Sequence, residues 1–212
     1  LKEIKEGTAV YTKNGEEDTL DGDAILLATG RGPNTEGLHA ERAGVELTKR
    51  GAVVTDKHLR TTAENIWAAG DVCGNLQFTY ISLDDSRIIL SDMQGDGSRT
   101  TENRGAFAYS VFMEPSFSRV GLSEKEAADK GLNYRVVRMN TDMIPKAKVL
   151  RKTTGMLKAV IDKDSGKIFG AALFCPESYE IINMVKLAMD HDLDYTVLRD
   201  FIYTHPTMRS EE

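Results

Sequence analysis

A strand pair followed by an amphipathic helix most strongly constrains how the second half of this chain can fold. Residues 155–162 and 167–174 are apolar and β-forming, and the polar, glycine-containing residues 163–166 separate them. This pattern predicts an antiparallel hairpin. Residues 178–189 then carry apolar side chains at helical spacing, at Ile181, Ile182, Val185 and Met189. A helix with such a stripe buries it against a sheet, so the pattern predicts an α+β domain.

Three further elements extend this domain from about residue 104 to the end of the chain. Residues 108–113 and 134–139 are strand-like. Ser123 and Glu126 have the spacing of a capping box, which predicts a short helix ending near Gly131. A further short helix is expected near residues 195–200.

The first half of the chain has short strands and glycine-marked loops. Residues 8–12 and the turn at 13–16 predict a hairpin, and residues 24–28 form a continuous apolar run typical of a buried strand. Residues 51–55 and 65–69 predict two more short strands. Residues 81–93 carry apolar side chains at broadly helical spacing. We expect an α/β region here, ending within the polar, glycine-rich residues 94–98 or soon after.

Composition excludes several classes of function. The 212 residues carry a net charge of -6, which argues against binding along a nucleic-acid backbone. The apolar runs are too short to span a bilayer. The two cysteines, Cys73 and Cys175, form no local pair, so no metal site and no local redox disulfide is predicted, and a reducing cytoplasm is expected. Because the chain begins at Leu1 in a strand-like pattern, we expect it to be a piece of a longer protein.

Two strand ends carry candidate binding residues. Thr29-Gly30 follows the apolar run at 24–28, and glycine there lets the backbone pass close to a flat ligand or to another segment. Gly70-Asp71 follows the predicted strand at 65–69, at the sheet edge where α/β folds bind ligands. A carboxylate there can accept hydrogen bonds from sugar or ribityl hydroxyls. An ordinary loop glycine and a helix N-cap aspartate are the alternatives.

Phe78 and Thr79 stand immediately before the predicted helix at 81–93. Backbone amides at a helix start can face an electron-rich carbonyl, and the helix dipole favours negative charge there. Simple core packing of Phe78 is compatible with that role.

His205 is the candidate acid-base residue near the end of the chain. Pro206 and Thr207 follow it, and Glu211 and Glu212 stand close by. Histidine titrates near neutral pH, and a carboxylate can hold its ring in one tautomer. On its own, such a histidine is more often an ordinary surface residue or a satisfied core residue.

The order of these motifs resembles the pyridine nucleotide-disulfide oxidoreductases, the FAD enzymes related to glutathione reductase, lipoamide dehydrogenase and mercuric reductase. The resemblance rests on residues 28–34 (ATGRGPN), 65–71 (NIWAAGD) and 205–207 (HPT), in that order, with 118–124 (SRVGLSE) between the last two. It covers nearly the whole chain. It implies the end of an NAD(P)H domain at 1–30, the C-terminal part of an FAD-binding domain at 31–103, and an interface domain at 104–212 that forms a homodimer.

The resemblance also implies roles for single residues. Asp71 would bind the FAD ribityl chain, Phe78 and Thr79 would lie against the pyrimidine side of the flavin, and Thr29-Gly30 would lie near FAD. His205 would be the acid-base group for a redox thiol pair in the partner subunit, next to a peptide bond that is usually cis. The parent enzyme would pass hydride from NAD(P)H to FAD and electrons to a cysteine pair and then to an oxidant. A bacterial stress-related reductase of undefined oxidant fits best.

The chain departs from the family pattern in two ways. It contains neither the redox C-x4-C pair nor a G-x-G-x-x-G turn, so by itself it is expected to be inactive, and its FAD binding is in doubt. The family glutamate stands five residues after the histidine, whereas this chain has Ser210 there and Glu211 next. Either Glu211 takes the role with a shifted backbone, or the histidine-carboxylate pair is lost.

Two other functions remain open. The chain could be a stand-alone, non-catalytic dimerisation module, because its helix at 178–189 and its hairpins offer apolar surface. It could also come from an FAD-dependent relative, such as a monooxygenase or a monodehydroascorbate reductase, that has no use for His205.

Overall fold

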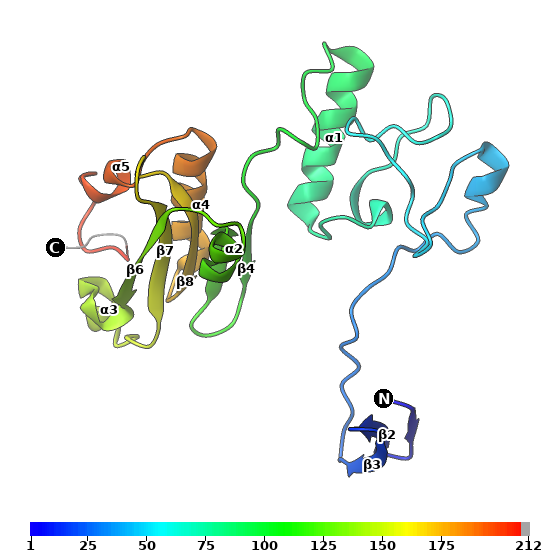
Figure 1. Ribbon diagram of the computed structural model, residues 1–212, viewed down its shortest axis with the longest axis horizontal. Coiled ribbons are helices and arrows are strands. Elements are labelled where there is room, and N and C mark those ends of the chain that lie inside the picture. The colour runs from blue at the N-terminus through cyan, green and yellow to red at the C-terminus, as the bar shows by residue number, and fades with distance from the viewer. Residues whose placement is uncertain (209–212) are drawn as a thin grey trace. The chain divides into compact units, whose positions relative to one another are not determined.

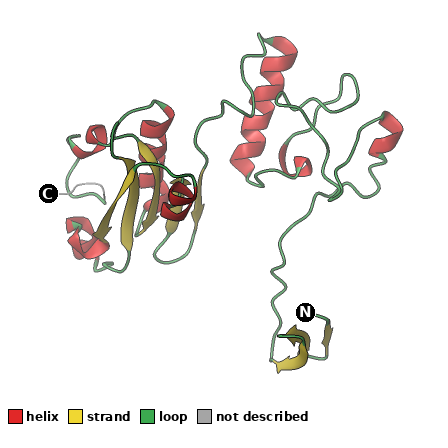
Figure 2. Ribbon diagram, in the orientation of Figure 1, coloured by secondary structure: helices red, strands yellow, loops and turns green. Residues whose placement is uncertain are grey.

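The structure, a computed structural model, describes residues 1–208 (Figure 1). The chain divides into two compact units, one spanning Leu1–Thr101 and the other beginning at Glu102. Loops make up most of the first unit, whereas the second is built on a sheet (Figure 2).

A small antiparallel sheet opens the first unit. Its strands are β1 (Glu3–Lys5), β2 (Thr8–Lys13) and β3 (Glu16–Asp21). Asn14 and Gly15 connect β2 to β3 with φ of 53° and 89°. A two-residue turn with both φ positive matches the twist of the flanking strands, and Asn-Gly adopts it readily. The hairpin predicted here is confirmed.

The buried strand predicted at residues 24–28 is wrong. This run belongs to no strand, and Leu26 and Leu27 are 89% and 68% exposed. A strand of this kind needs a neighbour on each side to bond its backbone. None of the strands among residues 1–208 pairs with it. The run therefore has the apolar composition of a buried strand but no strand partner among residues 1–208.

The strands predicted at 51–55 and 65–69 are reduced to isolated bridges. Val53 pairs with Leu47, and Trp67 pairs with Arg60. Two 3-10 helices flank these bridges in the sequence: η1 (Ala40–Ala43) precedes them and η2 (Gly70–Cys73) follows them.

Helix α1 (Thr79–Gln94) confirms the helix predicted at 81–93. Its buried side is formed by Ile81, Asp85 and Ile88. Ile88 is fully buried and packs with Leu59 and Cys73. This small core holds the loops of the first unit against one side of α1.

The second unit is built on a five-stranded antiparallel sheet in the order β4-β5-β8-β7-β6. Its strands are β4 (Ala108–Val111), β5 (Phe117–Gly121), β6 (Tyr134–Asn140), β7 (Met156–Asp162) and β8 (Ile168–Phe174). Its helices are α2 (Glu124–Asp129), the 3-10 helix η3 (Thr141–Met143), α3 (Pro145–Leu150), α4 (Ser178–Asp190) and α5 (Thr196–Arg199). Helix α4 packs against β4, β5 and β8.

The predictions for the second unit are largely confirmed. The hairpin is formed by β7 and β8, and α4 covers the sheet as its apolar stripe predicted. Ser123 and Glu126 make both bonds of the capping box at the start of α2. Strand β5 and helix α3 were not predicted.

Candidate functional site

The Gly70-Asp71 turn lies against α1. Gly70 has φ of +75°, a conformation that glycine adopts without strain, and a Cβ there would come within 2.7 Å of Ser82 Oγ on the helix. The Gly70 N–H donates to Asp85 Oδ2 at 2.8 Å. Asp71, the next residue, is exposed. The turn therefore holds its backbone on the helix and presents the Asp71 carboxylate to solvent.

Helix α1 begins in the same unit, and its residue Asp85 is bonded to the same turn. Phe78 is the N-cap and is half-buried, and Thr79 is the first helical residue and is exposed. Asp85, further along α1, accepts the bond from Gly70. The Gly70-Asp71 turn is thus bonded to the helix whose N-cap is Phe78 and whose first residue is Thr79.

Thr29 and Gly30 are exposed and lie outside any helix or strand. The next residue, Arg31, donates from Nη2 to the Gln77 backbone carbonyl at 3.1 Å. Gln77 stands directly before the Phe78 cap, so this bond links the Thr29-Gly30 segment to the start of α1. Sequence reasoning did not single out Arg31.

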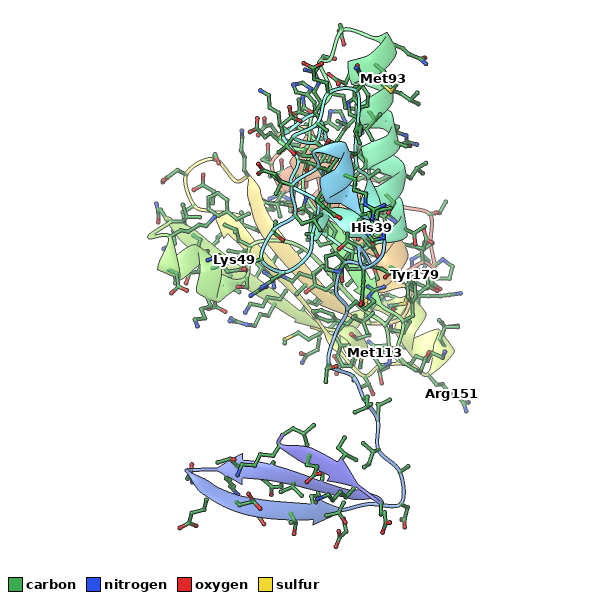
Figure 3. All side chains as sticks on the ribbon, turned by 90° about the vertical axis from the view of Figure 1, so that its right-hand side faces the viewer. His39, Lys49, Met93, Met113, Arg151 and Tyr179 are labelled. Carbon is green, nitrogen blue, oxygen red and sulfur yellow. The ribbon has the colours of Figure 1, made fainter. Side chains whose placement is uncertain are left out.

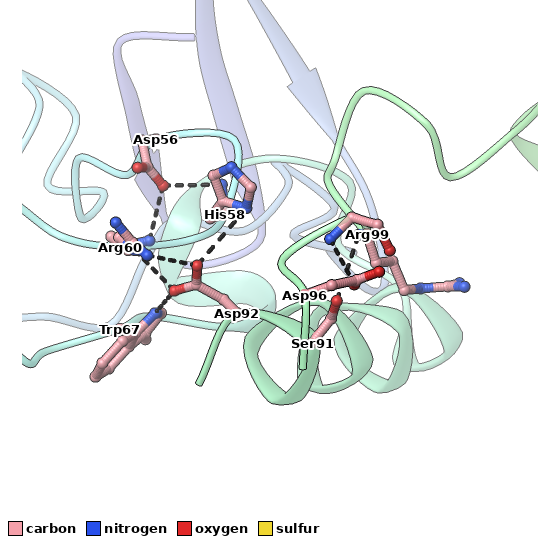
Figure 4. A network of polar contacts seen from close by, with 9 residues as sticks. Asp56, His58, Arg60, Trp67, Ser91, Asp92, Asp96 and Arg99 are labelled. Carbon is pink, nitrogen blue, oxygen red and sulfur yellow. Dashed lines mark hydrogen bonds and ion pairs between the residues drawn. The ribbon is translucent and has the colours of Figure 1, made fainter. Parts of the chain in front are cut away.

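A cluster of polar side chains holds the other end of α1 (Figure 4). Asp92 accepts two bonds from Arg60, at 2.7 and 2.6 Å, and one from the Trp67 indole N–H at 2.8 Å. Asp56 in turn accepts from the backbone N–H groups of His58 and Arg60. The Arg60 guanidinium, with the Trp67 bond, holds the pKa of Asp92 below its usual value. This network fixes the segment that leads to Gly70-Asp71.

His205 lies on an exposed bend of the second unit. The Tyr203 hydroxyl donates to the Leu198 carbonyl at 2.9 Å, and Met208 is buried in the core cluster of this unit. Thr207 Oγ1 donates to the Thr204 carbonyl at 3.0 Å. The bend is thus anchored on both sides while the imidazole faces solvent. The His205–Pro206 peptide bond is cis. Glu211, the predicted partner of His205, lies outside the described residues.

Both cysteines are free and buried. Burial raises the pKa of the Cys175 thiol to about 11, and Glu177 acts in the same direction. Cys73 packs beside Leu59 and Ile88. Neither thiol has the exposure of a redox-active cysteine, and the pKa of Cys175 is raised where a redox-active thiol has a lowered one.

Two family models match the chain. One, described as pyridine nucleotide-disulphide oxidoreductase, covers residues 1–86. The other, described as the dimerisation domain of pyridine nucleotide-disulphide oxidoreductases, covers residues 107–212. The chain belongs to the pyridine nucleotide-disulphide oxidoreductase family. Members of this family are FAD-dependent and take electrons from NAD(P)H.

Curated relatives and solved structures agree with this assignment. The probable pyridine nucleotide-disulfide oxidoreductase RclA of Escherichia coli is 50% identical over 92% of this chain and 44% of its own length. Mercuric reductase of Staphylococcus aureus is 35% identical over 95% of this chain and 37% of its own length. A Cu(II) complex of the HOCl-induced flavoprotein disulfide reductase RclA from Escherichia coli superposes with a TM-score of 0.89 at 47% identity, over 97% of this chain and 47% of that one.

These comparisons confirm the family and the fold class predicted from the sequence. The match to the oxidoreductase model lies in the first unit, and the second unit, an α+β domain, carries the match to the dimerisation-domain model. The chain spans less than half the length of the curated relatives named above. No helix among residues 1–208 is long and apolar enough to cross a membrane, and these residues contain no cluster of three or more potential metal ligands.

Proposed function

We propose that this chain forms the C-terminal half of an FAD-dependent reductase that transfers electrons from NAD(P)H to a cysteine pair and then to an oxidant. The observation that carries the proposal is the Gly70-Asp71 turn, bonded to the helix that begins beside Phe78. In a chain of this family, that arrangement offers the Asp71 carboxylate and the start of α1 within the same unit, as an FAD site would need.

The residues present fit FAD. Asp71 offers an exposed carboxylate that can accept hydrogen bonds from ribityl hydroxyls, and Thr79 stands at a helix start suited to an electron-rich carbonyl. Close glycine packing supports the turn, because a Cβ on Gly74 would come within 2.6 Å of Ala52 Cβ. FAD, when bound, would supply the hydride chemistry. The protein residues would orient it: Asp71 on the ribityl chain, Phe78 and Thr79 at the pyrimidine end, and Thr29-Gly30 nearby.

We further propose that His205 moves protons for the redox thiols of a partner subunit. The bend places its imidazole in solvent, where it could reach a group on another chain. A histidine with a pKa near neutral pH can hold or release the proton of a thiol during exchange. Glu211 is proposed to orient the imidazole.

A homodimer through residues 104–212 is part of the same proposal. The match to a dimerisation-domain model supports it. Exposed apolar side chains of the second unit support it too. Phe112 is 80% exposed, and its ring centroid lies 5.5 Å from that of Tyr179, with the two rings tilted. Met113 is 51% exposed (Figure 3 labels Met113 and Tyr179). Apolar surface of this kind is typical of a subunit interface.

The decisive experiment is to express the complete protein to which this chain belongs and record its visible spectrum. We expect a flavin spectrum that bleaches on addition of NADH or NADPH and recovers with an oxidant. A colourless complete protein would overturn the proposal. The 212-residue chain alone should show no turnover, because its two cysteines are buried and form no pair.

Two free thiols also favour a reducing cytoplasm.

A second candidate function is a non-catalytic dimerisation module. The exposed apolar side chains of the second unit favour it. Light scattering of the 212-residue chain tests it directly, and a monomer at high concentration would count against it.

A further inference from the structure

Two carboxylates on α1 hold the segment that leads to Asp71. Asp85 accepts from the Gly70 N–H, and Asp92 accepts from the Trp67 indole N–H, each at 2.8 Å. The two carboxylates are seven residues apart on the helix, which is about 10.5 Å at 1.5 Å per residue. The donating residues, Trp67 and Gly70, are three residues apart in the sequence, which is about 10 Å of extended backbone at 3.3 Å per residue. The two backbone spacings are similar, so the segment can lie along the helix.

The segment runs antiparallel to α1. Trp67 bonds near the end of the helix and Gly70 bonds closer to its start, so the chain moves toward the helix start as it approaches Asp71. Ala69 is extended, with φ of -133° and ψ of 150°, and Gly70 then turns with φ of +75°. The bond to Asp85 is therefore made at the residue where the chain turns.

Asp85 is an unexpected residue at this place. It lies on the buried side of α1 and is 3% exposed, although a carboxylate is costly to bury. Its neighbour Asp84 forms an ion pair with Arg99 instead. Of these two adjacent carboxylates, only Asp85 has a bond to the Gly70 backbone among the described residues.

We propose that Asp85 is a positioning residue for the flavin site. By fixing the Gly70 N–H, it sets where Asp71 lies relative to Phe78 and Thr79. Asp85 alone would thereby set the distance between Asp71, which contacts the ribityl chain, and the residues at the pyrimidine end of the flavin. This inference rests on the proposed function and extends it to a residue that does not touch the cofactor.

The contact itself can be tested in the 212-residue chain without any cofactor. Amide exchange of Gly70, followed by NMR, should be at least about tenfold faster in Asp85→Leu than in the wild type. Asp84→Asn is the matched control, because it changes the adjacent carboxylate and should leave Gly70 protected. Unchanged protection in a folded Asp85→Leu chain would show that the bond does not hold the turn, and would overturn the proposal.

The role is tested in the complete flavoprotein by the FAD dissociation constant and the flavin absorbance spectrum. Asp85→Leu should weaken FAD binding at least about tenfold and shift the spectrum. Asp85→Asn should restore both, because its amide oxygen can accept the same bond. If the leucine variant does not fold, Asp85→Glu keeps the carboxylate but displaces it by one methylene, and should weaken FAD binding by about threefold or more.

The outcomes separate the two proposals. A complete wild-type protein that binds no FAD overturns the proposed function, and with it the role of Asp85. A wild type that binds FAD, together with Asp85→Leu or Asp85→Glu of normal FAD affinity and normal spectrum, overturns the positioning role alone.

Discussion

The Trp67 indole N–H donates to Asp92 Oδ2 at 2.8 Å, and this bond joins a loop to the last turns of α1. The same carboxylate receives both bonds of the Arg60 guanidinium (Figure 4). A side chain from the loop before Gly70-Asp71 therefore shares its acceptor with a second loop residue, and one carboxylate joins both to α1.

Replacing Trp67 with phenylalanine should lower the free energy of unfolding of the first unit by about 1.5–3 kcal/mol, because it removes a hydrogen bond to a charged acceptor. Urea denaturation followed by circular dichroism measures the change. Tyr11→Phe is the matched control, since it removes a hydrogen bond to the exposed Asp18 carboxylate and should cost much less. Equal losses in the two variants would contradict this expectation.

Glu126 should make the stability of the second unit dependent on acid. Its bonds to Ser123, with the nearby Arg119, lower its pKa from 4.5 to about 2. A lowered pKa in the folded state stabilises the fold above pH 4.5, and this contribution is lost as the pH falls from 4.5 to about 2. The difference in melting temperature between wild type and Glu126→Gln should therefore shrink over that range. Lys125→Gln is the control, and a difference independent of pH would refute the assignment.

Ser178 should be costly to replace despite its small size. Its hydroxyl lies 2.9 Å from Ser116 Oγ and 2.8 Å from Ser118 Oγ, and all three side chains are buried. Ser178→Ala leaves two buried hydroxyls each short of a partner, so we expect a loss of about 1–3 kcal/mol in unfolding free energy. Urea denaturation measures it, with Thr153→Ala as a surface control. A loss no larger than the control's would show that the hydroxyls find other partners.

The two cysteines should resist labelling while the chain is folded. With a pKa of about 11, only about one Cys175 thiol in a thousand is a thiolate at pH 8. Ellman's reagent should therefore react with neither Cys175 nor Cys73 at an appreciable rate until denaturant is added. Rapid labelling of one thiol per folded chain would contradict the burial described above.

His205→Ala in the complete protein should lower turnover by about 10²–10⁴-fold, the usual contribution of a general acid-base group, with FAD content unchanged. His191→Ala is the matched control, because His191 is also exposed in the second unit. Steady-state assays with NAD(P)H and an oxidant measure both. Unchanged turnover would instead favour an FAD-dependent relative that does not use a thiol acid-base group.

Helices and strands whose packing partners lie nearby in the sequence could be predicted from it. The β7-β8 hairpin, α4 and the capping box of α2 depend on contacts within one short region, and the structure confirms them. Residues 24–28 show the opposite case, because an apolar run predicts burial only when neighbouring strands are present to cover it. Strand β5 was missed for another reason. Its buried residue Ser118 forms hydrogen bonds to hydroxyls on β4 and α4, and an apolar pattern gives no sign of such a polar inward-facing residue.

The motif order led to Gly70, Asp71, Phe78 and Thr79, whose roles stay predictions. The structure bonds the Gly70-Asp71 turn to the helix that begins at Thr79. The motif order did not lead to Asp85, because an aspartate in mid-helix has no sequence signature for bonding a backbone amide in another segment. Only the three-dimensional arrangement pairs it with Gly70.

The exposed run at residues 24–28 makes the separate chain vulnerable to self-association. Apolar side chains on backbone that belongs to no strand are what intermolecular sheets recruit. As the concentration rises, copies could join through this segment while both folded units stay intact. The solubility of the chain at high concentration would then depend on residues that contribute nothing to its core.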